Sequence, residues 1–350
     1  MLWIFFPAIK SSVSLGNKNI GYISSSKVHL LRVIMETIPP LKDTRLLIKD
    51  VRFERVKVRI YQPKASSNSL RRGMLYFHGG VDSIWPVTGN DCAKTLSLLF
   101  RYRLAPEHPY PAQFEDCLTA AIHFLRTAQD HGVDPSRVVI CGDSSGGTLT
   151  AAVAQALVNR RDLPKLRAQI LIYPFLQNAR VPILLKERTL VLGLKYINLD
   201  LGFIKELFKG CHVSEQQRLK YQKWVSPDHI PHEFKTRGYK PSPKSPPSEE
   251  ICEMAKLVFD PVFSPLLAED SVIAQLPETF LLTCEFDVLR DDGLLYKKRL
   301  EDHGIKVTWC HLEEGFHGTV FLNTNHVWKR ESTGSVYKEY GQRLRKGCIC

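Results

Sequence analysis

Three side chains in this 350-residue chain have the types and the order of a serine nucleophile, its orienting carboxylate and its base. Ser144 lies in a G-D-S-S-G run at 142–146, between the β-branched residues 138–140 and the Ala-rich stretch 148–158. A G-x-S-x-G run between a strand and a helix forms a sharp turn that exposes its serine hydroxyl. The N–H groups that begin such a helix, including that of Ser145, can stabilise a developing oxyanion. The sequence therefore predicts a nucleophile at Ser144.

A serine nucleophile needs a base to take its proton and a carboxylate to orient that base. Two apolar segments later in the chain, 280–284 and 307–311, have the pattern of buried strands. Asp287 follows the first segment and His317 follows the second, in the chain order Ser, Asp, His. From the residues alone, three neighbouring carboxylates remain alternatives to Asp287, namely Glu285, Asp291 and Asp292.

Strand patterns alternate with helical patterns along most of the chain. Alternation of apolar and polar residues predicts a hairpin over 46–60, and short apolar runs predict strands at 74–77, 96–101, 138–141, 168–173, 280–284 and 307–311. Helices are predicted over 117–125, 148–158 and 294–303. This order predicts an α/β fold with a mostly parallel central sheet flanked by helices.

The composition excludes several classes of function. The net charge is +12, but the basic residues are spread out and no nucleic-acid-binding signature accompanies them, so we expect no nucleic-acid partner. The nine cysteines show no C-x-x-C spacing, which predicts neither a metal site nor a dense disulfide framework. The apolar run 1–9 is too short for a membrane span, which needs about 20 residues.

Five ordered motifs carry a resemblance to a known family. They are His78-Gly79-Gly80, the run YRLAPEHP at 102–109, GDSSGG at 142–147, DVLRDDG at 287–293 and GFHG at 315–318. With these motifs the chain resembles the hormone-sensitive-lipase-type α/β-hydrolases, and within them the arylacetamide deacetylase-like branch. The segments 61–64, 264–270 and 295–300 are also similar to that branch.

The resemblance implies a serine carboxylic ester hydrolase that acts on small lipophilic acyl esters or arylacetamides without a metal or an organic cofactor. It implies Ser144 as nucleophile, His317 as base and acid, and Asp287, which opens the D-x-L-R-D pattern, as the orienting carboxylate. The oxyanion hole is expected at Gly79, Gly80, Val81 and Ser145, with His78 positioning the loop. The resemblance also implies a membrane-associated protein of the endoplasmic reticulum, although this sequence has no full transmembrane span.

These expectations divide the chain into four regions. Residues 46–177 and 261–322 form the α/β-hydrolase core, and 178–260 form an inserted helical cap. Residues 1–45 are an N-terminal segment that is a remnant of a cap or an anchor, and 323–350 are a polar, basic tail.

The cap sequence predicts the character of the substrate pocket. Together with the N-terminal segment, the cap is expected to roof the pocket above Ser144 with apolar side chains, as suits an acyl or aryl substrate. The cap side chains expected there include Leu201, Phe203, Ile204 and Phe208. The alternative is that this stretch is ordinary helical core.

Two departures from the family pattern favour an alternative function. The family's oxyanion loop usually reads H-G-G-G, and Val81 stands at the fourth place here. The interval from His78 to Tyr102 is short, which leaves a helical stub and is expected to expose apolar sheet surface. The alternative is therefore a catalytically impaired member that binds apolar ligands or a lipid surface.

The oxyanion loop, rather than the catalytic side chains, is expected to limit activity. A branched side chain at Val81 resists positive φ and crowds the approach of the substrate. Val81→Gly should therefore raise turnover, by about tenfold for each 1.4 kcal/mol of recovered transition-state stabilisation. Steady-state hydrolysis of a neutral ester measures the change, and an unchanged rate would mean that the loop tolerates valine.

Overall fold

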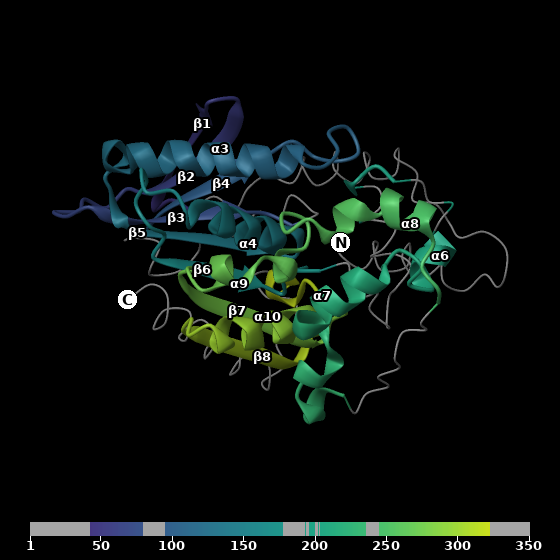
Figure 1. The fold of residues 1–350 in the computed structure, drawn as a ribbon. Helices are drawn as coiled ribbons and strands as arrows, with labels where there is room; N and C mark the ends of the chain where they lie inside the picture. The colour runs from purple at the N-terminus through teal and green to yellow at the C-terminus, as the bar shows by residue number, and fades with distance from the viewer. Residues whose placement is uncertain are drawn as a thin grey trace. The chain divides into compact units, whose positions relative to one another are not determined.

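The computed structural model describes residues 43–79, 95–177, 193, 196–199, 202, 204–235 and 245–322. Eight strands of these residues form one sheet in the order β1-β2-β4-β3-β5-β6-β7-β8 (Figure 1). They are β1 (Leu46–Phe53), β2 (Val56–Pro63), β3 (Arg71–Phe77), β4 (Thr95–Arg101), β5 (Val133–Asp143), β6 (Ala168–Ile172), β7 (Glu278–Phe286) and β8 (Val307–Phe316).

The predicted mostly parallel sheet is confirmed. Strands β1, β2 and β4 pair antiparallel, and every other neighbouring pair is parallel. Strand β3 pairs directly with β4, so the short segment 78–94 that joins them is long enough to close the parallel crossover. The carboxyl ends of β5, β7 and β8 therefore lie at one edge of the sheet, where residues that follow them can meet.

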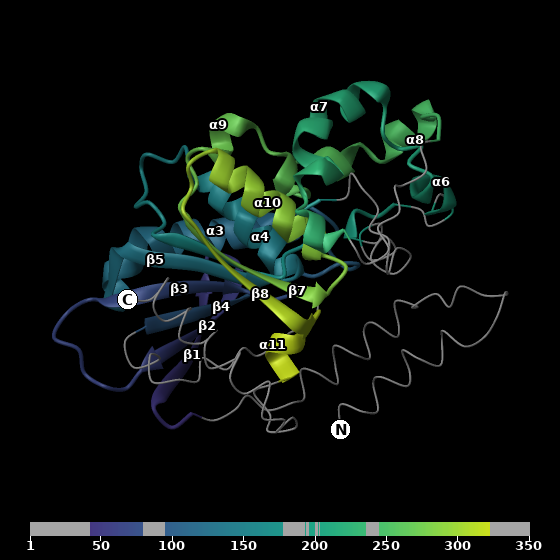
Figure 2. The same cartoon turned by 90° about the horizontal axis from the view of Figure 1, so that it is seen from below.

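The longer helices cover one face of the sheet (Figure 2). They are α3 (Ala112–Thr127), α4 (Ser145–Leu157) and α10 (Arg290–Asp302), and the short α9 (Asp270–Ile273) lies beside α10 in the same view. Apolar side chains of these helices, such as Phe124, Leu149 and Leu295, pack with alternate residues of the strands in one buried cluster.

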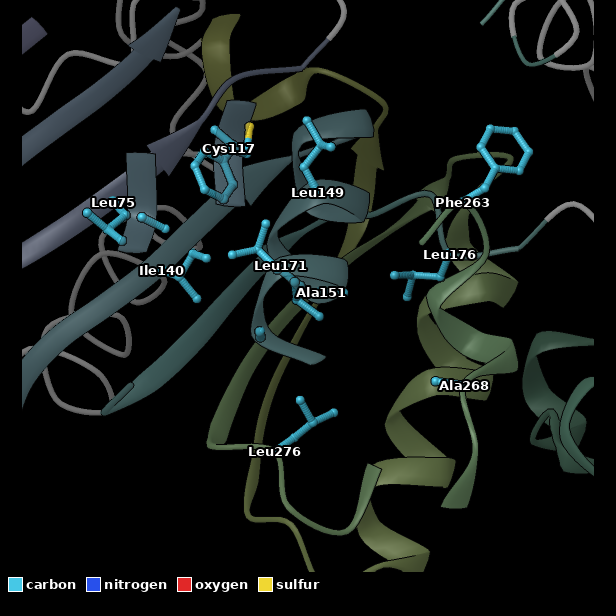
Figure 3. Close-up of a cluster of buried hydrophobic side chains, with 14 of the residues drawn as sticks. Leu75, Cys117, Ile140, Leu149, Ala151, Leu171, Leu176, Phe263, Ala268 and Leu276 are labelled. Atoms are coloured by element: carbon cyan, nitrogen blue, oxygen red, sulfur yellow. The ribbon is translucent and has the colours of Figure 1, made fainter. Parts of the chain in front are cut away.

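This buried cluster supports the turn between β5 and α4, which carries Ser144. Leu75, Ile140 and Leu171 belong to three neighbouring strands and are essentially inaccessible to solvent. Figure 3 shows these side chains beside Leu149 and Ala151 of α4. Close packing of this kind makes the base of the turn between β5 and α4 rigid.

The opposite face of the sheet is also buried. Its strand residues form a second cluster that includes Tyr76, Leu99 and Val139, each at most 7% exposed. The expectation that the short crossover exposes apolar sheet surface is therefore wrong for these residues. Burial of both faces is the rule for parallel strands, whose sequences read as continuous apolar runs.

The described parts of the region predicted as a cap contain the α-helices α6 (Ile204–Phe208), α7 (Glu215–Val225) and α8 (Glu249–Met254) and short 3-10 helices. Ile204, Trp224 and Ile251 are buried and belong to the same cluster as the core. These three side chains therefore pack with the core, while most of α7 is not buried, with Leu219 69% exposed. Leu201 and Phe203, also predicted for the roof, lie outside the described residues, as does the side chain of Phe208.

Most of the N-terminal segment and the whole tail, 323–350, also lie outside the described residues. The chain divides into two compact units, 1–40 and 41–350, and every described residue belongs to the second. Within the described ranges, no helix combines the length and the apolar character needed to cross a membrane.

Asp292 of α10 ties the turn after β6 to the helix layer. Its Oδ2 accepts hydrogen bonds from the backbone N–H of Leu176 at 3.1 Å and of Gln177 at 3.3 Å. Its Oδ1 accepts a third from Nε2 of Gln177 at 2.9 Å. Burial raises the pKa of Asp292 from 3.8 to about 7, and these hydrogen bonds oppose the rise. The native protein therefore retains a proton at Asp292 that the unfolded chain releases at lower pH.

The free energy of unfolding should therefore fall as the pH rises from about 4 to about 7. Asp292 contributes at most about 1.4 kcal/mol per pH unit to this fall. Above both pKa values the contribution becomes constant. Asp292→Asn removes the proton exchange, so the free energy of unfolding of this variant should fall less steeply than that of the wild type. Urea denaturation at several pH values between 4 and 8 measures both slopes.

Asp302→Asn is the matched control, because Asp302 lies at the end of the same helix, is 53% exposed and pairs with Lys298. Its slope should follow that of the wild type. Identical slopes for Asp292→Asn and the wild type would contradict the assignment of the proton to Asp292.

Candidate active site

Ser144 occupies a strained turn between β5 and α4. Its φ is 53° and its ψ is −120°, a backbone conformation that costs a non-glycine residue about 1–3 kcal/mol. The Ser144 N–H donates to the carbonyl of Ile172 at 3.0 Å, and the Ser144 carbonyl accepts from the N–H of Gly147 at 3.0 Å and of Thr148 at 3.2 Å. These bonds hold the turn on both sides of the serine.

Two glycines let the backbone pass through this turn. A Cβ at Gly142 would lie 2.6 Å from Oγ1 of Thr150 and would overlap the backbone of Gly146. A Cβ at Gly146 would overlap the backbone carbonyls of Phe77 and His78. The glycines on both sides of Ser144 are therefore required by close backbone approach, as the sequence pattern indicates.

The structure brings Ser144, His317 and Asp287 together at the carboxyl edge of the sheet. Nε2 of His317 lies 2.9 Å from Oγ of Ser144, and Nδ1 lies 2.8 Å from Oδ2 of Asp287. The Asp287 carboxylate accepts the Nδ1–H, which leaves Nε2 to accept the hydroxyl proton of Ser144. The Asp287 side chain is fully buried and that of His317 is 40% exposed, so the imidazole can meet a substrate.

The three alternative carboxylates have other partners. Glu285 lies 3.2 Å from Nε2 of His311 and 2.9 Å from Nη1 of Arg290. Asp291 accepts from Nε of Arg290, and Asp292 faces the turn after β6. Asp287 also accepts the N–H of Leu289 at 2.9 Å, which fixes the rotamer that faces His317.

The start of the predicted oxyanion loop is held by aromatic and polar contacts. The ring of His78 stacks on Tyr102 with 4.5 Å between centroids, and the Tyr102 hydroxyl donates to the His78 carbonyl at 2.5 Å. The Gly79 N–H donates to Oδ1 of Asp143 at 3.0 Å. Gly79 was expected as an oxyanion donor, and this hydrogen bond directs its N–H to the carboxylate instead. Gly80 and Val81 lie outside the described residues.

Asp143 joins the loop to the serine turn. It immediately precedes Ser144, is 3% exposed, and its Oδ1 also accepts from the Tyr76 hydroxyl at 2.5 Å. Burial raises the pKa of Asp143, and the hydrogen bonds from Tyr76 and Gly79 and the nearby rings of His78 and His317 oppose the rise. A buried carboxyl with two donors thus ties the start of the loop after β3 to the turn that carries Ser144.

Sequence reasoning missed Asp143, Tyr76 and Tyr102 as site residues. Asp143 and Tyr102 are part of motifs that carried the family resemblance, so a signal for them was present. Tyr76 lies within an apolar strand and had no local signal. Among the described residues, no group of three or more His, Cys, Asp or Glu side chains could hold a metal ion.

The fold and this site define an α/β-hydrolase. A family model described as "alpha/beta hydrolase fold" matches residues 74–190 and 248–321. Human arylacetamide deacetylase-like 4 is 44% identical over 89% of this chain and 81% of its own length. Bovine arylacetamide deacetylase is 36% identical over 93% of this chain and 87% of its own length. The chain therefore belongs to the arylacetamide deacetylase-like branch of the α/β-hydrolase family.

Solved structures agree on the fold. A hyperthermophilic esterase from the archaeon Pyrobaculum calidifontis superposes with a TM-score of 0.58 at 21% identity, covering 99% of this chain and 98% of its own. A structure titled as an arylesterase has a TM-score of 0.56 at 21% identity, covering 95% and 94% of the two chains. At this identity the likeness concerns the fold alone.

Loss of the hydrogen bond between Gly79 and Asp143 should lower the turnover rate. Asp143→Ala removes the carboxylate that accepts from Tyr76 and Gly79, and loss of such a buried hydrogen-bonding group costs about 1–3 kcal/mol. We expect kcat on a neutral ester to fall about 5-fold to 150-fold with little change in KM, because the loop acts on the transition state. Asp143→Asn keeps an acceptor oxygen and should retain most of the activity.

Asp134→Ala is the control, because Asp134 lies on the same strand, is only half-buried and accepts hydrogen bonds from the nearby Ser136. Circular dichroism of each variant verifies the fold. Equal kcat for Asp143→Ala and the wild type would show that the loop keeps its position without the carboxyl.

Proposed function

We propose that the chain is a serine hydrolase that cleaves lipophilic carboxylic esters or arylacetamides through an acyl-enzyme intermediate. The observation that carries the proposal is the position of His317, within 2.9 Å of the Ser144 hydroxyl and 2.8 Å of the Asp287 carboxylate. A base held between a nucleophile and a buried carboxylate has the geometry needed for acyl transfer.

In the acylation step, Oγ of Ser144 attacks the carbonyl carbon while Nε2 of His317 takes its proton. The buried Asp287 carboxylate stabilises the imidazolium that forms. The carbonyl oxygen becomes an oxyanion, and the donors proposed for it are the N–H groups of Gly80, Val81 and Ser145. His317 then gives its proton to the leaving alcohol or amine as the carbon–oxygen or carbon–nitrogen bond breaks.

In the deacylation step, water takes the place of the leaving group. His317 removes a proton from the water, whose oxygen attacks the acyl carbon, and the proton returns to Oγ of Ser144 as the acid leaves. The exposed side of the His317 ring gives this water a route to the base. Every proton in the cycle is carried by His317, so the reaction needs no metal or organic cofactor.

The substrate class is proposed from two supports. Relatives of 36–44% identity are named as arylacetamide deacetylase or as proteins like it. Phe286 directly precedes Asp287 and Phe316 directly precedes His317, and these two residues pair across β7 and β8 and are 60% and 38% exposed. Apolar surface next to the reacting groups suits an acyl or aryl substrate. Association with a membrane surface and location in the endoplasmic reticulum stay predictions from the resemblance.

The test is covalent labelling of the purified chain with a fluorophosphonate probe, which reacts with an activated serine. The wild type should be labelled at Ser144, and Ser144→Ala should not be labelled. Loss of the base in His317→Ala should slow labelling by at least about 10²-fold, the lower range for a general base.

Ser145→Ala is the matched control, because the neighbouring hydroxyl is replaced while its backbone N–H is kept. It should be labelled as the wild type is. A folded wild type that resists the probe would contradict the proposal and support the alternative, in which an impaired member of the family binds apolar ligands or a lipid surface.

A further inference from the structure

The segment 226–235 docks on the core through Phe234, beside the strand that leads to Asp287. Phe234 ends the short helix η6 (His232–Phe234). Its ring meets the His311 ring edge-on at 5.1 Å between centroids and the Trp309 ring at 6.0 Å. The guanidinium carbon of Arg290 lies 5.2 Å from the same ring centroid. The half-buried ring thus packs against residues of β8 and α10.

One guanidinium joins this segment to the strand that carries the acid. The Arg290 side chain is 12% exposed. Its Nη2 donates to the backbone carbonyl of Phe234 at 2.7 Å, and its Nη1 donates to Oε1 of Glu285 at 2.9 Å. Its Nε donates to Oδ1 of Asp291 at 3.0 Å. Charge-assisted bonds of this kind are stronger and more directional than neutral ones.

Arg290 and Glu285 lie on either side of the Asp287 turn. Glu285 is two residues before Asp287, and Arg290 is three residues after it. The Arg290 N–H donates to the Asp287 carbonyl at 3.2 Å, and the Leu289 N–H donates to its carboxylate at 2.9 Å. A shift of Arg290 therefore acts on the backbone that sets the direction of the carboxylate.

Glu285 is held from its second side by a chain of hydrogen bonds. The Trp309 indole donates to Oγ1 of Thr283 at 2.9 Å, and the Thr283 hydroxyl lies 2.9 Å from Nδ1 of His311. An indole N–H only donates, so the Thr283 hydroxyl can donate to Nδ1 and leave Nε2–H of His311 to donate to Glu285. Burial lowers the pKa of His311, which favours the neutral ring that this chain requires.

We infer that Arg290 is a positioning residue that couples docking of the segment 226–235 to the orientation of Asp287. With the segment docked, the guanidinium is fixed by the Phe234 carbonyl and ring, and it holds the Asp287 turn closed. When the segment leaves, Arg290 loses both contacts and the turn loosens. The inference rests on the proposed function, because the orientation of Asp287 has consequences only if His317 serves as a base.

The experiment measures docking and reactivity separately. Hydrogen–deuterium exchange of the peptides that contain 231–235 and 285–289 reports the two ends of the coupling, and it needs no activity. The second-order rate of fluorophosphonate labelling reports the reactivity of Ser144. The variants are Arg290→Gln, Arg290→Lys, Phe234→Ala and the control Arg59→Gln. Arg59 is 16% exposed and pairs with Asp50 in the β1–β2 hairpin.

In Arg290→Gln we expect faster hydrogen exchange in both peptides and labelling of Ser144 that is about tenfold slower, which corresponds to about 1.4 kcal/mol. The kcat on a neutral ester should also fall, while KM should change by less than about twofold. Arg290→Lys keeps the charge but not the fork, so its rate should lie between those of Arg290→Gln and the wild type. Phe234→Ala should change exchange and labelling in the same direction as Arg290→Gln. Arg59→Gln should change neither.

Two results would overturn the inference. The first is wild-type labelling in Arg290→Gln together with faster exchange in 231–235, since the segment would then undock without consequence for the site. The second is slow labelling with unchanged exchange in 231–235, since Arg290 would then act without the segment. If the wild type is not labelled at all, the proposed function fails. The coupling is then decided by hydrogen exchange alone: unchanged exchange of the 285–289 peptide in Phe234→Ala would overturn the inference.

Discussion

The positive φ of Ser144 is the constraint on which the arrangement of the site depends. A serine at φ 53° holds this conformation only where its surroundings determine it fully. The carbonyl of Ile172 fixes one side of the turn, and the N–H groups of Gly147, Thr148 and Phe175 fix the other through the Ser144 carbonyl. Strand β6 supplies Ile172 and helix α4 supplies Gly147 and Thr148, and the buried cluster of strand and helix residues gives the turn a rigid base. The hydroxyl is presented at the carboxyl edge of the sheet for this reason.

The same sheet edge explains how residues far apart in the chain meet. Strands β5, β6, β7 and β8 are consecutive neighbours and all parallel, so the residues that follow them share one edge. His317 and Asp287 come from the last two strands, and Asp143 ties the turn after β5 to the loop after β3. On this account Arg290 adds a further connection, from the segment 226–235 to the backbone of the Asp287 turn. Each connection is a hydrogen bond to a buried or nearly buried charged group, where geometry is well defined.

The sequence predicted the strands, their mostly parallel pairing and the positions of Ser144 and His317, because each of these has a local signal in apolar runs and in the residues that follow them. Asp287 was distinguished from three neighbouring carboxylates only by the family resemblance. It did not predict the start of β5 at Val133, since Asp134 and Pro135 read as a turn. It also assigned the Gly79 N–H to the oxyanion hole. The actual acceptor, Asp143, lies 64 positions away in the chain, and no local pattern indicates that hydrogen bond. The contact of Phe234 with Arg290 is of the same kind, since it depends on tertiary packing and no local pattern predicts it.

The most direct measurement of the central claim is the site of acylation during turnover. The purified chain is mixed with a neutral p-nitrophenyl ester, quenched in acid on the millisecond scale, digested and mapped by mass spectrometry. The account predicts that the peptide containing Ser144 gains the mass of the acyl group while one equivalent of p-nitrophenol is released. Release of p-nitrophenol with no acyl mass at Ser144, or with the acyl mass on another residue, would contradict it.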